Sequence, residues 1–335
     1  MAGSDSAIAG ARKRRRGMPL RWPSYVGAVP ELLDKRLVIV TGKGGVGKST
    51  VALALGLAAA ARGRRTIVCE VSSQEHVSRV FHRAEVGFHE VKMADNLWAI
   101  SIDPDEAMRE YVLLQLRVRA ARDLLFRSRI FTYLAAATPG LRELVTIGKI
   151  WEVALPDRKV RKGRKYDLVI VDAPATGHGV GFLQTPRTFA NIARVGPIKA
   201  QAEALETFIV NHRKTGVAIV ALPEEMPVNE TAALERSLTD EIGVAVDRVY
   251  MNALYPERFT RAEIERLEAV AGNGDRGGVR AVSRAALSES RRADSQRQQL
   301  ARLAEVVDAP LRTLPFIFKP EIGVEEIGQL SREID

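Results

Sequence analysis

The sequence predicts an α/β protein with a doubly wound, mostly parallel sheet and an inserted helical subdomain. Short aliphatic runs with strand character alternate with helical stretches along the chain. Several of these runs are continuously apolar, which is typical of parallel strands that helices cover on both faces. A glycine-rich octet at residues 42–49 joins the first run to a helical stretch, as a phosphate-binding loop does.

The expected strands recur from the start of the apolar sequence to its end. They cover residues 36–41, 65–71, 97–102, 166–172, 216–222, 248–253 and 311–314. In a sheet of this kind the functional residues lie at the carboxyl ends of the strands. The octet and an acidic residue at the end of the fourth run both occupy such positions.

Two stretches are helical rather than alternating. Residues 104–160 form the predicted insert, which starts after Asp103 at a proline and two acidic residues and includes a second helix over about 141–153. Residues 256–306 predict further helix, divided by a glycine-rich loop at 272–278.

Composition limits the class of protein. The 335 residues carry a formal net charge of +9, with five basic residues at 12–16. We expect residues 1–30 to be a disordered basic tail, although such a run also suits nucleic acid or anionic lipid, and residues 31–335 to form one domain. The longest apolar stretch, 51–61, is too short to span a bilayer, and no apolar segment follows the basic run as in a signal peptide. A cytoplasmic protein is expected. The single cysteine, Cys69, argues against a zinc cluster.

The octet reads GKGGVGKS and predicts nucleotide binding. Its glycines let backbone N–H groups wrap phosphates, and the start of the following helix adds positive potential. Lys48 is expected to reach the β- and γ-phosphates, and the Ser49 hydroxyl to bind Mg²⁺. The cofactors are therefore ATP or ADP with Mg²⁺. The residues expected to bind them here are Gly42, Gly44, Gly45, Val46, Gly47, Lys48, Ser49 and Thr50.

A second lysine, Lys43, lies one residue into the loop. The octet thereby resembles the deviant phosphate loop (deviant Walker A) of a class of dimeric ATPases. This class includes arsenite-pump motors, tail-anchored-protein targeting factors, septum-placement and partition ATPases, and the nitrogenase iron protein. The resemblance implies that Lys43 reaches the nucleotide of a partner subunit, so that ATP holds two subunits together.

Asp172 ends the strand-like run 166–172 in the manner of a Walker B motif, where a carboxylate holds Mg²⁺ through water. The segment that follows, Ala173 to His178, closely resembles switch II of the arsenite-pump and tail-anchored-targeting ATPase family. Its small residues suit a loop that rearranges when the γ-phosphate leaves. The residues expected to be catalytic are Lys43, Lys48 and Asp172.

Three more segments appear in family order. Leu222 to Met226, with Glu230 and Thr231, resembles the family's Pro-Glu segment ahead of a helix, and Asn252 matches the asparagine that reads adenine. The late loop that closes over the base is matched by Leu314, Pro315 and Phe316. The resemblance covers roughly residues 37–330. The run 176–179 and the segment 183–187 look most like the bacterial branch.

Switch I departs from the family pattern. The family has an aspartate that positions the attacking water, and Ser72 stands at that position here. Because phosphoryl transfer depends on positioning and electrostatics, its loss predicts weak or partner-dependent hydrolysis with ATP binding retained. Glu75 or His76 are candidate substitutes, as is Glu70, which lies on the strand and is expected to point elsewhere.

The resemblance also bears on the client. The cysteines that bind arsenite in the pump motor are absent here, which argues against arsenite transport. The paired-cysteine zinc clasp of the eukaryotic targeting factors is absent as well. Those factors hold a transmembrane helix in a methionine-rich groove. The predicted insert holds one methionine, Met108. Its composition favours core packing with a solvated basic face, and a client groove is the alternative interpretation.

These observations favour a dimeric ATP-driven switch of the bacterial arsenite-pump or tail-anchored-targeting type. It would form a homodimer, or a heterodimer with a paralogous subunit that supplies the missing aspartate, and act on a protein or membrane-protein client. One alternative is a nucleotide-gated scaffold that barely hydrolyses ATP. Another is a partition- or septum-placement-type ATPase, against which the acidic end at residues 321–335 argues. Nucleic acid is not an expected partner.

Overall fold

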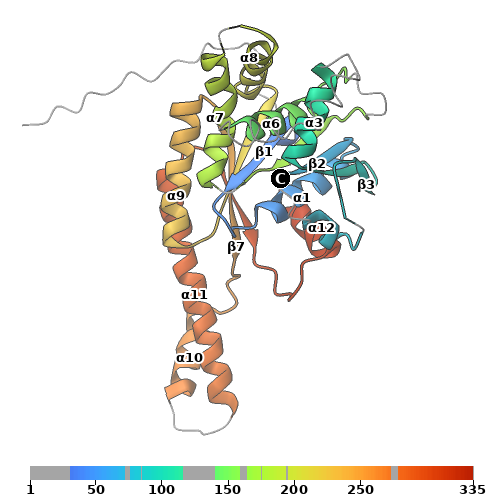
Figure 1. Cartoon of the computed structure of the whole chain (residues 1–335). Coiled ribbons are helices and arrows are strands. Elements are labelled where there is room, and N and C mark those ends of the chain that lie inside the picture. The colour runs from blue at the N-terminus through green and yellow to red at the C-terminus, as the bar shows by residue number, and fades with distance from the viewer. Residues whose placement is uncertain are drawn as a thin grey trace, which may run out of the picture.

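The computed structural model describes residues 31–71, 76–83, 85–115, 140–158, 164–174, 176–193, 195–272 and 278–334. Their centre is an eight-stranded sheet with the order β3-β4-β2-β5-β1-β6-β7-β8 (Figure 1). Adjacent strands are parallel, except that β3 pairs antiparallel with β4. The strands are β1 Leu37–Gly42, β2 Thr66–Val71, β3 Val91–Ala94, β4 Leu97–Ile102, β5 Leu168–Asp172, β6 Thr215–Ala221, β7 Val246–Leu254 and β8 Leu311–Pro315.

The predicted doubly wound, mostly parallel sheet is therefore confirmed. Each expected aliphatic run forms a strand, and the strand missing from the prediction is β3. Its sequence, Val-Lys-Met-Ala, mixes polar and apolar residues and has no aliphatic run. It forms because an antiparallel edge strand needs only one buried face, and Met93 supplies it.

Helices cover both faces of the sheet. They are α1 Lys48–Ala61, α2 His76–Val80, α3 Pro104–Gln115, α6 Leu141–Ala154, α7 Thr176–Ile192, α8 Pro197–Ile209, α9 Glu225–Arg236, α10 Arg261–Gly272, α11 Gly278–Val306 and α12 Val324–Glu333, with the short 3-10 helix η1 Leu32–Asp34 and the π-helix η2 Ser237–Ile242. One buried cluster joins the sheet to α1, α2 and α12, and the other joins it to α6, α7, α8 and α9.

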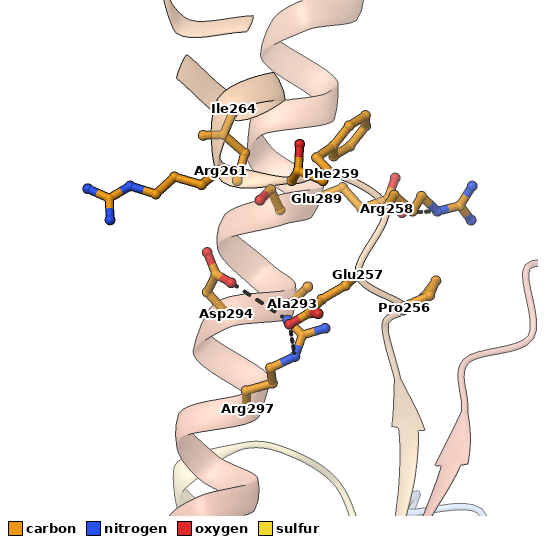
Figure 2. A pocket seen from close by; sticks show the side chains of 12 residues that line it. Pro256, Glu257, Arg258, Phe259, Arg261, Ile264, Glu289, Ala293, Asp294 and Arg297 are labelled. Atoms are coloured by element: carbon orange, nitrogen blue, oxygen red, sulfur yellow. Dashed lines mark ion pairs between the residues drawn. The ribbon is translucent and has the colours of Figure 1, made fainter. Parts of the chain in front are cut away.

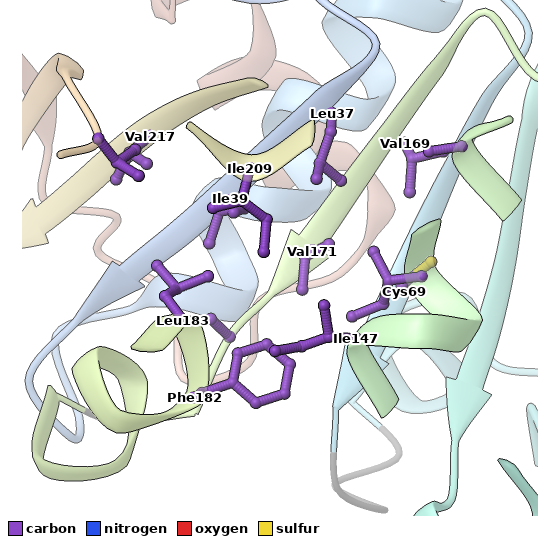
Figure 3. Packing of buried hydrophobic residues seen from close by; sticks show 14 of the residues in the cluster. Leu37, Ile39, Cys69, Ile147, Val169, Val171, Phe182, Leu183, Ile209 and Val217 are labelled. Carbon is purple, nitrogen blue, oxygen red and sulfur yellow. The ribbon is translucent and has the colours of Figure 1, made fainter. Parts of the chain in front are cut away.

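Alternate residues of each central strand face these two clusters. In β1, Leu37 and Ile39 belong to the same buried cluster as Phe182 and Leu183 of α7 (Figure 3). Val38 and Val40 face the other side and lie in the cluster that contains α1. Both faces are apolar because both are covered, which is why these strands read as continuous aliphatic runs.

The predicted insert is helical where the structure describes it. Helices α3 and α6 follow β4 and precede β5, and they pack on each other. Asp103 starts α3, since its Oδ1 accepts hydrogen bonds from the N–H groups of Asp105 and Glu106 at 2.8 and 3.0 Å. The predicted tail and residues 116–139 lie outside the described residues, so the division of the chain into tail, domain and insert stays a prediction.

Helices α10 and α11 form an antiparallel pair that extends away from the sheet (Figure 1). The glycine-rich loop expected between them falls at residues 273–277, outside the described residues. Among the helices that the structure describes, none combines the length and the apolar character needed to cross a bilayer.

Candidate functional site

The phosphate loop connects β1 to α1 at the carboxyl edge of the sheet. Gly44, Gly45 and Val46 lie between the two elements. Gly42 and Gly47 have positive φ angles of 144° and 93°. A Cβ atom on Gly42 would overlap the carbonyl oxygen of Val220 in β6. These positions require glycine, so the local sequence fixes the loop's shape.

Lys48 and Thr50 lie in the first turn of α1, where backbone N–H groups lack helical partners. The Lys48 Nζ donates a 2.9 Å hydrogen bond to the carbonyl oxygen of Lys43, back across the loop. Burial lowers the pKa of Lys48, and the negative charge of Asp172 opposes that shift. The ammonium group is thus held inside the loop where phosphates are expected.

Ser49 and Asp172 meet although 123 residues separate them. The Ser49 Oγ donates a 2.5 Å hydrogen bond to Oδ2 of Asp172, which is 7% exposed at the end of β5. Parallel pairing of β1 with β5 brings the two together, with Val40 opposite Asp172. Burial raises the pKa of Asp172, while the Ser49 hydrogen bond and Lys48 lower it.

These two oxygen donors fit Mg²⁺ chemically, since Mg²⁺ prefers one or two protein oxygens and completes its shell with water and phosphate. The structure places the predicted metal ligands side by side at the start of α1. No cluster of three or more His, Cys, Asp or Glu side chains suited to a metal occurs in the part of the chain that is described. The expectation that zinc is absent stays a prediction.

Lys43 contacts Glu230 of α9 within the same chain. Its Nζ donates to Glu230 Oε1 at 2.7 Å, and the two side chains are 37% and 38% exposed. The resemblance implied that Lys43 reaches a partner subunit; in this structure it is paired in its own chain at a half-exposed position. The sequence placed Glu230 in a family segment but did not suggest this contact.

Asn252 lies against the phosphate loop. Its Nδ2 donates a 2.9 Å hydrogen bond to the carbonyl oxygen of Val46, and a Cβ on Gly47 would overlap that same amide nitrogen. A side-chain amide has a second N–H and a carbonyl oxygen, so this hydrogen bond leaves groups that suit a base. The adenine-reading role of Asn252 stays a prediction.

Pro315 ends β8, and the Phe316 N–H donates to the carbonyl oxygen of Leu254 at 2.8 Å. The Phe316 ring packs against Tyr255 and Phe318, with ring centroids 4.7 and 4.8 Å apart. Sequence reasoning found Phe316 but missed its two aromatic partners. The alternating aromatic residues at 316 and 318 are the signal that was available.

Arginines stack on this aromatic cluster. Arg258 lies over the Phe318 ring at 4.7 Å, and Arg292 over the Tyr255 ring at 5.0 Å. Arg258 also lines a cavity of about 310 Å³ between the segment after β7 and the helices α10 and α11 (Figure 2). The cavity is charged, and its lining arginines already pair with acidic residues, Arg258 with Glu289 and Arg297 with Glu257 and Asp294.

The structure corrects one expectation about switch I. Glu70 was expected to point away from the site, but its register partner on the neighbouring strand is Asp172. Val68 and Ile170, two residues earlier on each strand, both pack on the α1 side. Because side chains alternate along a strand, Glu70 and Asp172 share that side.

The other switch I candidates are only partly described. Ser72 and Glu75 lie outside the described residues. His76 begins α2, and burial, followed by the charge of Arg79, lowers its pKa. Burial raises the pKa of Glu70, and the charge of Asp172 adds to the rise, whereas the Val77 N–H lowers it.

Comparison with known proteins is consistent with this site. The family model described as anion-transporting ATPase, ArsA_ATPase, matches residues 35–195, which include the loop and Asp172. The chain is 31% identical over 270 residues to ATPase BagA of Mycobacterium tuberculosis, covering 79% of this chain and 76% of that protein. The chain belongs to the ArsA family of ATPases.

Eukaryotic relatives of this ArsA-family chain match over a shorter part. ATPase GET3 of Podospora anserina is 28% identical over 159 residues, 46% of this chain and 45% of that protein. ATPase get3 of Neurospora crassa is 28% identical over 177 residues, with about half of each chain covered. The family resemblance stated from the sequence is confirmed.

Proposed function

We propose that this ArsA-family ATPase is a Mg²⁺-dependent, ATP-driven switch that dimerises around its nucleotides. It acts with a paralogous subunit on a protein or membrane-protein client, and its own hydrolysis is weak or depends on the partner. The observation that supports nucleotide binding most directly is the contact of Ser49 with Asp172 beside Lys48. It brings the expected phosphate-binding and metal-binding groups to one point.

Each residue has a distinct task in this proposal. Lys48 exchanges its bond to the Lys43 carbonyl for the phosphates, and the glycine backbone wraps them. Ser49 would supply a metal ligand, and Asp172 would accept hydrogen bonds from water bound to the metal. When bound, Mg²⁺ neutralises the charge of the phosphates. Ser72, in place of an aspartate, leaves the attacking water without a carboxylate at that position.

Dimerisation is supported by Lys43. The Lys43 side chain is 37% exposed, so it is accessible to a second subunit, and its ion pair with Glu230 holds it at the protein surface. The closed dimer would require Lys43 to leave Glu230 and reach the partner's phosphates. Homodimer and heterodimer both satisfy this requirement, and the missing switch I aspartate favours the heterodimer.

A client site is supported by the helices between β4 and β5. A partly open, mainly apolar cavity of about 460 Å³ lies among α3, α6 and α8. Ala107, Tyr111, Val145 and Trp151 contribute apolar surface, while Lys149 and two glutamates add charge. A mainly apolar cavity among these helices suits a hydrophobic segment of a client.

The test is steady-state ATP hydrolysis by the purified chain, measured beside its ATP affinity and its mass in solution with and without nucleotide. Tight Mg²⁺-dependent binding with near-zero turnover supports the proposal and directs the search to a paralogue that restores activity. Brisk turnover by the lone chain, abolished by Lys48→Ala, would refute the weak-hydrolysis part. A mass that stays monomeric with every nucleotide would refute the homodimer, and binding to DNA or anionic vesicles that needs residues 1–17 would favour a partition-type ATPase.

A further inference from the structure

We propose that Glu70 is a second carboxylate of the Mg²⁺ site, positioned to accept hydrogen bonds from water around the metal of a bound Mg²⁺–nucleotide. The inference rests on the proposed function, because it requires a Mg²⁺–nucleotide complex at the phosphate loop. It assigns Glu70 as a positioning residue of that complex.

The position of Glu70 follows from the sheet. Strand β2 pairs with β5 in parallel register, and Glu70 lies opposite Asp172 at the carboxyl edge. Strands in a sheet are about 4.8 Å apart, so the two carboxylates leave neighbouring strands side by side. Both are on the face that α1 covers, and α1 is the helix that carries Ser49. Glu70 is therefore one strand further from the loop than the expected metal-binding aspartate.

The two oxygens of Glu70 differ in their contacts. Oε1 accepts a 3.0 Å hydrogen bond from the N–H of Val77 in the first turn of α2. Oε2 is buried without a hydrogen-bond partner, and the residue is 2% exposed. A buried, unsatisfied carboxylate oxygen is costly, and in a native protein such a group calls for an explanation, of which a bound water or ion is one.

Burial and the charge of Asp172 disfavour the charged form of Glu70, and the Val77 and His76 N–H groups and the charge of Arg79 oppose them. A neutral glutamine would satisfy the Val77 N–H without burying a charge next to Asp172. Two adjacent carboxylates repel each other, and the positive charge that bears on Asp172 is that of Lys48. A divalent cation with its water shell removes the repulsion and supplies donors for the unused oxygen.

The experiment measures how much Mg²⁺ strengthens nucleotide binding. The affinity of the full chain for a non-hydrolysable ATP analogue is determined by calorimetry in EDTA and in excess Mg²⁺, for the unmodified chain and for Glu70→Gln. Removing an outer-shell partner of a metal typically lowers metal affinity about 10- to 100-fold. We expect Glu70→Gln to reduce the Mg²⁺ enhancement about tenfold or more, with affinity in EDTA unchanged.

Glu235→Gln is the matched control, because Glu235 is also a buried carboxylate, and it accepts backbone N–H bonds from Asp308 and Ala309 away from the loop. It should leave the Mg²⁺ enhancement unchanged; an equal loss in Glu235→Gln would overturn the proposal. An unchanged enhancement in Glu70→Gln, or an equal loss with and without Mg²⁺, would overturn it too. If Glu70→Gln does not fold, Glu70→Asp must show the same selective loss, because its carboxylate is withdrawn by one methylene.

The two levels of inference fail differently. If the unmodified chain binds no nucleotide, the proposed function and the role of Glu70 both fail. If Mg²⁺ strengthens binding equally in the unmodified chain and in Glu70→Gln, the proposed function stands and Glu70 has only the structural role of holding α2.

Discussion

Replacing Glu230 with glutamine should strengthen nucleotide-dependent dimerisation. In the single chain the Lys43 ammonium is paired with Glu230 at 2.7 Å, and the proposed dimer needs that lysine at the partner's phosphates. Each subunit must therefore break this pair before the dimer closes. The substitution weakens a contact that exists only in the open form.

The size of the effect follows from the exposure of the pair. With both side chains more than a third exposed, the pair contributes about 0.2–1 kcal/mol, as solvent-screened ion pairs do. A symmetric dimer breaks two such pairs, or about 0.4–2 kcal/mol, which corresponds to a dimer dissociation constant lowered roughly 2- to 30-fold. The expected increase is moderate and should shrink at high ionic strength.

Sedimentation equilibrium with Mg²⁺ and a non-hydrolysable ATP analogue measures this constant. Glu225→Gln is the control, since Glu225 lies on the same helix, carries the same charge and pairs with Arg302 at 3.6 Å at an exposed position. A dimer of Glu230→Gln that is no tighter than that of Glu225→Gln would show that Lys43 does not leave Glu230, and the reasoning would be wrong.

Three further outcomes are expected. Lys48→Ala should abolish hydrolysis and weaken nucleotide binding at least tenfold in calorimetry. Thermal unfolding should change little, because within the described residues the Lys48 ammonium makes one hydrogen bond, to the loop carbonyl of Lys43; unchanged affinity would contradict the loop assignment. Gly42→Ala should lower the free energy of unfolding, measured with denaturant, by about 1–3 kcal/mol or more, because the alanine would combine a strained φ with overlap on Val220. A free energy of unfolding equal to that of the unmodified chain would contradict this. Cys69 is fully buried and burial raises its pKa, so a thiol reagent should modify the native chain only after unfolding; rapid modification of the native chain would contradict its burial.

Much of the fold was predictable because covered parallel strands are chemically distinctive. Runs such as Leu37 to Val40 have no polar residue to expose, and helical stretches separate them. The edge strand β3 was not predictable in this way, since its partner β4 supplies the hydrogen bonds and only Met93 among its four side chains is fully buried. Its formation depends on tertiary pairing more than on propensity.

The site was predictable where it is local and unpredictable where it depends on packing. The loop from Gly42 to Ser49 is contiguous, so its type follows from the sequence. The contacts of Lys43 with Glu230 and of Asn252 with Val46 span 187 and 206 residues. They depend on how α9 and β7 are placed around β1, which residue spacing does not determine.

The direction of Glu70 is the clearest such case. Alternation alone places Glu70 with Val68 on one face of β2. All the residues of β2 from Thr66 to Cys69 are buried, so both faces are covered and composition does not show which face carries the loop. The register with β5 decides it.

A carboxylate fixed on a strand and held by the Val77 N–H keeps its position whatever the nucleotide, unlike a catalytic group on a switch loop. Metal binding and hydrolysis would therefore depend on different residues here: Glu70 and Asp172 would secure Mg²⁺, while turnover would be limited by what stands at Ser72. That separation predicts a chain that binds Mg²⁺–ATP well and hydrolyses it slowly until a partner supplies the missing carboxylate.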